Sequence, residues 1–285
     1  MRIMIFGAGG YLGKKLMRCL ESEGHKVAGV CRKIPADADT RDRKILRAGT
    51  EEVRRELQNV CYDWVINCAA VYEHGHTQIH QIVDANTIFA LQVLDCSLEC
   101  GVKKILTMDT GLPKHTNLYS FTKKQFAEFG EFYAERYGIT FVNILLEMFY
   151  GEDEPEGRFL AECCRKMMRG EPLFLTEGTQ KRDIIHIDDV CNAIKLILEA
   201  SLEGYRSIPV GSGEAVPIRT IIEYMHEVTG SDSALHFGAV PARADEPDCV
   251  ADMEILTGMG FQPEYSWKQG IRRLCRQNGG VKSSK

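Results

Sequence analysis

The chain opens with Met1-Arg-Ile-Met-Ile-Phe-Gly-Ala-Gly-Gly-Tyr-Leu-Gly13, an apolar run that leads directly into a cluster of glycines. The apolar run indicates a β-strand, and the helical spacing of Leu12, Leu16 and Leu20 indicates a helix at 11–22. Glycines at this junction let a pyrophosphate approach the backbone, and the N-terminus of the helix offers free N–H groups and a positive dipole end. The junction therefore predicts a dinucleotide-binding βαβ unit.

Strands and helices alternate through the first 150 residues of the chain. The sequence predicts strands at 26–31, 64–68, 104–108 and 140–146 and helices at 51–59, 77–100 and 119–137. Alternation of this kind indicates a parallel sheet that helices cover on both faces. We therefore expect an α/β fold, a Rossmann-type doubly wound parallel sheet.

A second region begins after Gly151, where an acidic loop rich in Pro and Gly precedes shorter helices and strands. We expect a smaller C-terminal α/β substrate lobe at 151–277, whose segments can interleave with the first domain at 1–150. The final residues, 278–285, are expected to form a flexible tail.

The composition narrows the class of protein. The 285 residues carry 35 Lys and Arg against 40 Asp and Glu, for a net charge of −5, and this balance gives no sign of a nucleic-acid partner. Hydrophobic residues make up 44%, which excludes bulk disorder, and no apolar run approaches the ~18 residues that span a bilayer. The first residues do not resemble a signal peptide, and the 11 scattered cysteines indicate reduced thiols. We therefore expect a cytoplasmic protein with no membrane partner.

Gly7, Gly10 and Gly13 recur every three residues at the junction of strand and helix. In this spacing the chain resembles the short-chain dehydrogenase/reductase superfamily, in the extended branch that acts on nucleotide sugars. The resemblance implies an NAD(P)-dependent enzyme with its coenzyme on the domain at 1–150 and a nucleotide sugar on the lobe at 151–277. It also implies coenzyme contacts along the glycine loop and after the third predicted strand, at Gly7, Gly10, Tyr11, Leu12, Gly13 and Ala69.

The end of the second predicted strand bears on the choice of coenzyme. Folds that prefer NAD place an acid there to bind the ribose 2′-OH, whereas this chain has Cys31 followed by Arg32 and Lys33. An arginine fork binds a 2′-phosphate, which an acid repels, so NADPH is favoured over NADH. The alternative is that both cations belong to a solvated strand end.

Tyr119 and Lys123 are four residues apart and therefore lie on one face of the helix predicted at 119–137. A tyrosine ordinarily ionises near pH ~10, and a neighbouring ammonium group and an oxidised nicotinamide both lower that pKa. Tyr119 can then donate a proton to a carbonyl oxygen as hydride reaches the carbon. Both residues are also expected to contact the coenzyme, Lys123 through the nicotinamide ribose.

The third catalytic group is expected to be a hydroxyl near the end of the strand predicted at 104–108, where Thr107 and Thr110 are both available. In the family that the chain resembles, this hydroxyl follows eight residues after a valine, here Val102. The resemblance therefore points to Thr110, in an oxyanion-like role. Asp109 stands beside it, and its expected role is to cap or anchor the following turn.

The stretch from Thr107 to Glu128 is more specific than the superfamily pattern. It resembles CDP-sugar 4-ketoreductases, the paratose and abequose synthase group, in which a Thr-x-Leu-Pro turn leads quickly into the tyrosine helix. Dehydratases carry an acid directly after the catalytic threonine, whereas this chain has Gly111-Leu112. Many epimerases carry an asparagine where this chain has Met148. The resemblance therefore implies a reductase that consumes NADPH.

The resemblance also implies contacts to a nucleotide sugar. Its diphosphate is expected to bind Arg182 and Arg243, and its ribose Glu246. Tyr72 is expected to line the sugar site. Phe174 either stacks on a pyrimidine base or belongs to the core.

Three histidines, His74, His76 and His80, lie close together in the sequence. No acidic or cysteine ligands accompany them in a metal-binding pattern, and hydride transfer needs no metal, so no metal site is expected. The helices predicted at 77–100 and 119–137 carry outward aromatic residues. In the family this pair of helices often forms a four-helix dimer interface, which implies a homodimer.

The expected function is NADPH-dependent reduction of the C4 ketone of a 4-keto-6-deoxy or 3,6-dideoxy nucleotide sugar, as in CDP-paratose and CDP-abequose synthesis. A CDP-sugar is favoured, and the product would supply a deoxysugar to a polysaccharide. One alternative is a nucleotide-sugar epimerase with tightly bound NAD, and another is a non-catalytic NADP-sensing regulator. The sequence leaves open the base, the sugar and the face of C4 that receives hydride.

Overall fold

The computed structural model describes residues 1–34, 44–72, 77–242 and 247–279. The chain folds as two compact units. The first consists of Met1–Leu145 and Ile194–Ile208, and the second of Leu146–Ala193 and Pro209–Lys285. The chain therefore leaves the first unit and returns to it once before it completes the second. The assignment of the coenzyme to the first unit and of the nucleotide sugar to the second stays a prediction.

A seven-stranded sheet forms the centre of the first unit, with the strand order β10-β6-β5-β4-β1-β2-β3. Its strands are β1 (Arg2–Phe6), β2 (Lys26–Cys31), β3 (Lys44–Arg47), β4 (Trp64–Asn67), β5 (Lys104–Thr110), β6 (Thr140–Leu146) and β10 (Tyr205–Val210). β1 pairs in parallel with both β2 and β4, while β2 pairs with β3 and β4 with β5 in the same direction. The chain order reverses between β1 and β4, the point at which Rossmann folds bind dinucleotides. The predicted Rossmann-type doubly wound sheet is confirmed.

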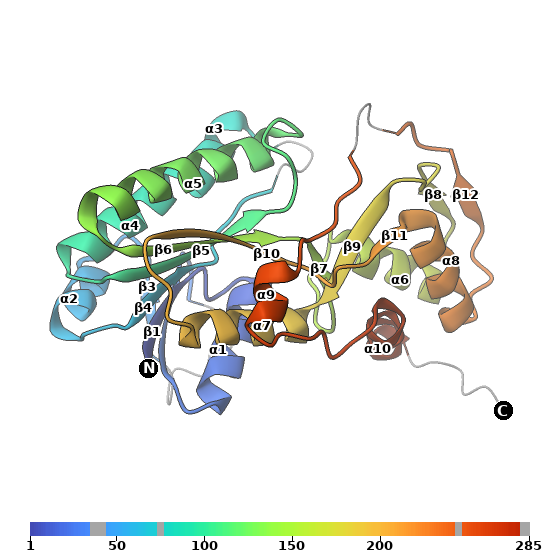
Figure 1. The fold of residues 1–285 in the computed structure, drawn as a ribbon. Helices are drawn as coiled ribbons and strands as arrows, with labels where there is room; N and C mark the ends of the chain where they lie inside the picture. Colours follow the sequence, from blue (N-terminus) through green and yellow to red (C-terminus); the bar gives the residue numbers. More distant parts are fainter. Residues whose placement is uncertain (35–43, 73–76, 243–246, 280–285) are drawn as a thin grey trace. The chain divides into compact units, whose positions relative to one another are not determined.

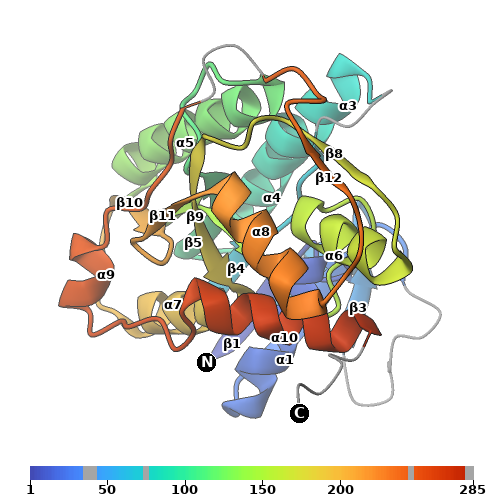
Figure 2. The same ribbon diagram turned by 90° about the vertical axis from the view of Figure 1, so that its right-hand side faces the viewer.

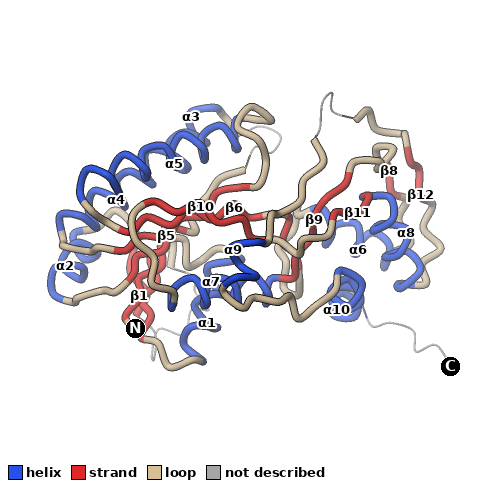
Figure 3. Tube along the Cα trace, in the orientation of Figure 1, coloured by secondary structure: helices blue, strands red, loops and turns tan. Residues whose placement is uncertain are grey.

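Helices cover both faces of this sheet (Figure 1, Figure 3). α1 (Tyr11–Ser22) lies on one face, and the other face carries α2 (Glu51–Asn59), α4 (Phe89–Glu99) and α5 (Leu118–Tyr137). Met4 and Phe6 of β1 pack in one buried cluster with Val53 of α2 and Val93 of α4. Neighbouring residues of a strand point to opposite faces, so β1 contributes to the core on both sides of the sheet. Each large apolar side chain buried in this way stabilises the fold by about 1.5–3 kcal/mol.

The helix predicted at 77–100 is confirmed as a helical stretch from Ile79 to Glu99, and a π-helical turn that the sequence did not predict interrupts its α-helical pattern. α3 (Ile79–Val83) is followed by a π-helical turn, η1 (Asp84–Ile88), and then by α4. Buried Asn86 lies in η1, where its side chain accepts from the N–H of Val71 at 2.8 Å and donates to the carbonyl of Val71 at 2.9 Å. A single π-helical turn within a helix often marks a functional site.

The second unit holds two small sheets, ordered β11-β9-β7 and β12-β8. Their strands are β7 (Met148–Tyr150), β8 (Leu173–Leu175), β9 (Lys181–His186), β11 (Ala215–Pro217) and β12 (Leu235–Phe237). The main helices are α6 (Phe159–Arg169), α8 (Ile218–Thr229) and α10 (Trp267–Gly279). These three helices lie beside one another (Figure 2). Met167, Ile222 and Leu274, one from each helix, belong to a single buried core. The predicted smaller α/β lobe is confirmed.

Two shorter features complete the fold. α7 (Ile187–Glu199) begins in the second unit and ends in the first, and α9 (Glu254–Gly258) is a short helix of the second unit. α10 continues through Gly279, so the first two residues of the tail predicted at 278–285 are helical. Among the helices of the described residues, none has both the length and the hydrophobicity that a membrane span requires.

Candidate active site

The glycine loop lies between β1 and α1, at the carboxyl edge of the sheet. The N–H of Gly7 donates to the carbonyl of Val30 at 2.9 Å, which attaches the loop to β2. Gly7 has a φ of +81°, and a Cβ at this position would lie 2.6 Å from the backbone nitrogen of Ala69. A Cβ on Gly13 would lie 2.2 Å from the carbonyl oxygen of Gly7. Neither position has room for a side chain, so the loop keeps an uncovered backbone.

The first turn of α1 faces this loop without a side-chain cap. Tyr11 and Leu12 open the helix after Gly10, which has no side chain to cap it, and the first turn carries no acidic residue. Uncapped N–H groups and the positive dipole end suit an anion, as a pyrophosphate requires. The loop, the contact between Gly7 and Ala69 and this helix end together fit a dinucleotide coenzyme.

Arg32 and Lys33 directly follow β2, and both side chains are exposed. They lie at the carboxyl end of the strand that neighbours β1, where Rossmann folds hold the adenine ribose. Among the described residues that directly follow β2, the chain therefore offers two cations and no acid to a ribose substituent.

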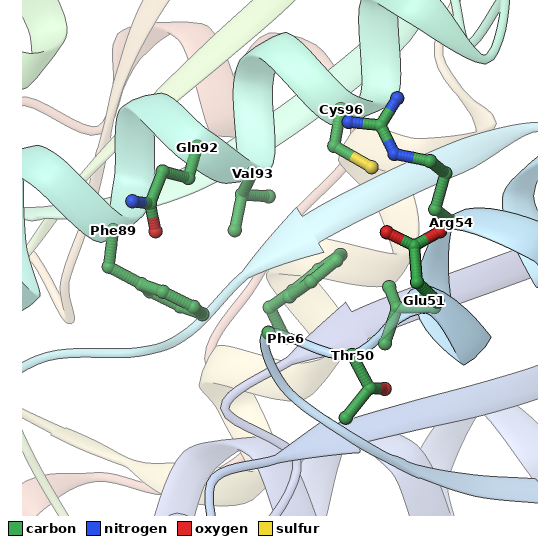
Figure 4. Close-up of a pocket in the computed structure, with 10 residues that line it drawn as sticks. Phe6, Thr50, Glu51, Arg54, Phe89, Gln92, Val93 and Cys96 are labelled. Atoms are coloured by element: carbon green, nitrogen blue, oxygen red, sulfur yellow. The ribbon is translucent and has the colours of Figure 1, made fainter.

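A cavity of about 210 Å³ opens beside the same edge of the sheet, between α2 and α4 (Figure 4). Its walls include the rings of Phe6 and Phe89, whose centroids lie 6.3 Å apart, together with Thr50 and Arg54. Phe6 directly precedes the glycine loop, so the cavity adjoins the region that fits the coenzyme.

Tyr119 and Lys123 lie one turn apart near the start of α5. Asn117 caps this helix, accepting from the N–H of Ser120 at 2.8 Å, and the cap holds the first turn in place. Tyr119 is 9% exposed and Lys123 2% exposed, so neither is a surface residue. Burial lowers the pKa of the Lys123 ammonium to about 8. The electrostatic effects of Asp109 and Cys68 oppose this shift but are smaller. The helix therefore holds a phenol and an amine that are both buried, and the pKa of the amine is lowered.

Thr110 is the last residue of β5, and its hydroxyl oxygen accepts a backbone hydrogen bond. The Thr110 Oγ1 accepts a hydrogen bond from the N–H of Leu112 at 3.2 Å, which leaves the hydroxyl proton to donate elsewhere. Thr107 is three positions earlier on the same strand, so its side chain points to the opposite face. Its buried hydroxyl finds no partner within the described part of the chain. Of the two threonines, Thr110 is the one suited to a substrate.

The ring of Tyr72 stacks on the ring of Tyr119, with centroids 4.6 Å apart and an interplanar angle of 27°. Tyr72 follows Val71, which Asn86 holds through the two hydrogen bonds described above, and Asn86 also donates to the hydroxyl of Thr122 at 3.3 Å. The structure thus brings a predicted sugar residue against the predicted acid. The role of Asn86 was not predicted, although a polar residue inside an apolar helix was a signal for it.

The predicted substrate residues of the second unit have different settings. Phe174 is 60% exposed and stacks on His236 of β12, with centroids 4.9 Å apart and an interplanar angle of 13°. It is therefore not a core residue, and His236 was missed because its partner strand is far away in the sequence. Arg182 is buried and donates to the carbonyls of Lys181 and Pro247 at 2.8 and 2.6 Å.

Four predicted residues lie outside the described part of the chain, namely Arg243, Glu246, His74 and His76. Within the described part, one group offers three metal ligands within 4.8 Å of one another, and it consists of Glu152, His186 and Asp188. Arg273 already forms ion pairs with both carboxylates of this group. A guanidinium therefore supplies the positive charge there, and the group is accounted for as an ion-pair network.

Comparison with known proteins agrees with this geometry. The model of the NAD dependent epimerase/dehydratase family matches residues 3–211. A CDP-abequose synthase from Salmonella typhimurium is 29% identical over 293 residues, which cover 96% of this chain and 97% of that protein. The predicted resemblance to this group is confirmed.

Solved structures show the same fold. The UDP-glucose 4-epimerase of Thermotoga maritima, solved with UDP-glucose, has a TM-score of 0.84 at 21% identity and covers 97% of this chain and 98% of its own. The UDP-glucuronic acid 4-epimerase of Bacillus cereus, in complex with UDP-glucuronic acid and NAD, has a TM-score of 0.85 at 21% identity, with coverage of 98% and 99%. The chain belongs to the NAD dependent epimerase/dehydratase family, the extended branch of the short-chain dehydrogenase/reductases, and is an enzyme of that NAD(P)-dependent type.

Proposed function

We propose that the protein reduces the C4 ketone of a 4-keto-6-deoxy or 3,6-dideoxy nucleotide sugar with NADPH. The observation that carries the proposal is the end of β5. There the donor hydroxyl of Thr110 precedes Gly111-Leu112, with no acid to expel a hydroxyl group, and α5 adds the buried pair Tyr119 and Lys123. Three groups for proton transfer and oxyanion stabilisation are thus available, whereas the acid that a dehydratase needs is missing.

In this mechanism, NADPH when bound supplies hydride to the carbonyl carbon. Tyr119 donates its phenolic proton to the carbonyl oxygen as negative charge develops there. The Thr110 hydroxyl donates a hydrogen bond to the same oxygen. Lys123 in its ammonium form stabilises the tyrosinate that remains and orients the nicotinamide ribose.

The setting of Arg32 and Lys33 supports NADPH over NADH. Both are exposed at the strand end where the ribose 2′ substituent lies, so a 2′-phosphate can take a bidentate contact from the arginine and a second charge from the lysine. The cavity between Phe6 and Phe89 adjoins this position, and we place the adenine ring there, against apolar and aromatic walls.

The substrate contacts are assigned from the second unit. Phe174 stacks on the base, Arg182 and Arg243 bind the diphosphate, and Glu246 binds the nucleotide ribose. The similarity to CDP-abequose synthase favours a cytidine base. Tyr72, which stacks on Tyr119, contacts the sugar. We place the enzyme in the cytoplasm, in keeping with eleven cysteines that are all free thiols.

Phe174→Ala is expected to raise the KM for the nucleotide sugar about tenfold and to leave kcat unchanged, because one aromatic stack contributes about 1–3 kcal/mol. Steady-state kinetics with saturating NADPH measure the effect. Phe159→Ala provides a control, since Phe159 is another exposed phenylalanine of the same unit. An unchanged KM in Phe174→Ala, or an equal rise in Phe159→Ala, contradicts the assignment.

A homodimer through α5 and η1 is part of the proposal. These elements carry four large apolar side chains that are 42–59% exposed, namely Ile88, Phe129, Phe132 and Tyr137. Apolar side chains gathered on one helical layer mark an interface between copies of a chain. Phe132→Glu is expected to convert a dimer into a monomer, as measured by light scattering on a sizing column. Ile255→Glu, an equivalent change in the second unit, should leave the dimer intact, and a dimeric Phe132→Glu contradicts this interface.

The test of the proposed function is NADPH oxidation by the purified protein across CDP-, dTDP-, GDP- and UDP-linked 4-keto sugars. We expect turnover with a CDP-linked substrate, and NMR of the product will give the configuration at C4. A second candidate function is nucleotide-sugar epimerisation, because the structural relatives include UDP-sugar 4-epimerases. Stoichiometric NAD on the purified protein and no NADPH consumption would establish an epimerase instead. A physiological role that survives Tyr119→Phe would establish a non-catalytic regulator.

A further inference from the structure

One buried carboxylate beside the site has no part in the mechanism above. Asp109 is 3% exposed and directly precedes Thr110 in β5. Its carboxylate accepts three hydrogen bonds, from the N–H of Thr110 at 2.7 Å, from Lys124 Nζ at 3.0 Å and from Asn143 Nδ2 at 2.9 Å. A buried anion with this many donors is held in one orientation, and the ion pair with Lys124 balances its charge.

The three bonds come from three different elements. Lys124 belongs to α5, Asn143 to β6, and the N–H of Thr110 to β5 itself. The carboxylate therefore ties the end of β5 to the helix that carries Tyr119. Both oxygens of the carboxylate are hydrogen-bonded, and bonds of this kind fix the relative position of the elements that contribute them.

Thr110 is held from both sides by this network. Its N–H donates to Asp109, and its carbonyl accepts from Lys124 Nζ at 2.7 Å. With both of its backbone polar groups engaged, the residue has little freedom to rotate. The hydrogen bond from the N–H of Leu112 then sets the direction of its hydroxyl.

Asp109 also acts on Lys123 through charge. Its negative charge raises the pKa of the Lys123 ammonium, as Cys68 does, whereas burial and the neighbouring Lys124 lower that pKa. Burial raises the pKa of the half-buried Tyr205 phenol of β10, and the charges of Glu131 and Asp109 raise it further. Loss of the carboxylate charge therefore favours the neutral amine at Lys123.

We propose that Asp109 is a positioning residue for ketone reduction, holding the Thr110 hydroxyl toward the substrate oxygen through a network with Lys124 and Asn143. The inference rests on the proposed function, since Thr110 has a ketone to stabilise only in that reaction. It replaces the sequence-based expectation that Asp109 merely caps the following turn. The bond to the N–H of Thr110 anchors the residue before the turn, and the other two reach into α5 and β6.

The main test is a double-mutant cycle of Asp109→Asn and Thr110→Ala, measured as kcat and KM for the ketone. Asp109→Asn is expected to lower kcat about tenfold and to leave the Kd for NADPH within about twofold of wild type. The cycle is measured near pH ~6, about two pH units below the Lys123 pKa of about 8, so that Lys123 keeps its proton. In the Thr110→Ala background the same change should then lower kcat by less than about twofold, because the group that Asp109 positions is already gone. Thr110→Ser keeps a hydroxyl, so in that background Asp109→Asn should again lower kcat about tenfold. Equal losses in both backgrounds overturn the proposal.

Asp189→Asn is the matched control. Asp189 is also buried, and its carboxylate accepts from the N–H groups of Glu264 and Tyr265 at 2.8 and 3.2 Å, within the second unit. Its loss is expected to lower Tm, and its effect on kcat should be the same in the wild-type and Thr110→Ala backgrounds. If Asp109→Asn does not fold, Asn143→Ala removes one donor without changing the charge. It should then show the same coupling to Thr110, and an additive result overturns the proposal.

Two further readouts do not depend on turnover. Hydrogen exchange of the Thr110 amide should be faster in Asp109→Asn, since a neutral acceptor replaces the carboxylate. NMR titration of lysine labelled with ¹³C at Cε should show a lower pKa for Lys123 in this variant. If the wild-type protein reduces no 4-keto sugar, the proposed function fails. The amide exchange and the Lys123 pKa then still test whether Asp109 holds the network together. Unchanged exchange and an unchanged Lys123 pKa then overturn the role of Asp109.

Discussion

Tyr119→Phe is expected to lower kcat for ketone reduction by about 10³-fold, since a positioned general acid contributes about 10²–10⁴-fold. The substitution keeps the ring that stacks on Tyr72 and removes only the hydroxyl that donates the proton. The Kd for NADPH and the KM for the ketone should therefore change little. Stopped-flow measurement of NADPH oxidation at saturating substrate isolates the chemical step.

Tyr137→Phe supplies the control for this experiment, because Tyr137 is an exposed tyrosine at the far end of the same helix. It should retain wild-type kcat. A Tyr119→Phe enzyme that keeps more than about a tenth of the wild-type kcat contradicts the assignment of Tyr119 as general acid. Water would then have to supply the proton.

The double variant Arg32→Ala/Lys33→Ala is expected to lower kcat/KM for NADPH by about 10²–10⁴-fold. Each charge-assisted hydrogen bond contributes about 1.5–3 kcal/mol, and every 1.4 kcal/mol corresponds to a factor of about ten. NADH lacks the 2′-phosphate, so kcat/KM for NADH should stay within about twofold of wild type. Steady-state kinetics with both coenzymes against the same ketone measure the change in preference.

Lys26→Ala is the control for the coenzyme prediction, since Lys26 is an exposed cation at the opposite end of β2. It should leave the preference for NADPH unchanged. An equal loss with both coenzymes would show that the double variant damages the fold of the strand end. No loss with either would show that Arg32 and Lys33 do not touch the coenzyme.

The parts of the fold that the sequence predicts are those determined by local patterns. The bounds predicted for the first helix, 11–22, and for the strand at 26–31 match α1 and β2, because apolar periodicity and glycines mark both ends. Tyr119 and Lys123 follow from a four-residue spacing on one helix. β3 was missed, since it has only four residues, with exposed Lys44 and Arg47 at its ends.

The features that escaped the sequence depend on contacts between distant residues. Asp109 and Asn143 are 34 positions apart, and no local pattern in either segment points to the other. Asn143 was nevertheless a signal, as a polar residue in the middle of an apolar strand. Phe174 and His236 meet only because β8 and β12 pair, and neither strand exceeds three residues. Arg182 was predicted as a diphosphate ligand, which stays a prediction, and no local pattern indicated that its side chain is buried and donates to two backbone carbonyls.

The central claim, hydride transfer from NADPH to C4 of a nucleotide sugar, has a direct test in a single turnover with NADPH deuterated at the transferring position of the nicotinamide. A CDP-linked 4-keto-6-deoxysugar should yield an alcohol with deuterium at sugar C4, together with one equivalent of NADP⁺. A protein that is purified with bound NAD, interconverts sugar epimers and leaves the deuterated NADPH unconsumed would contradict it.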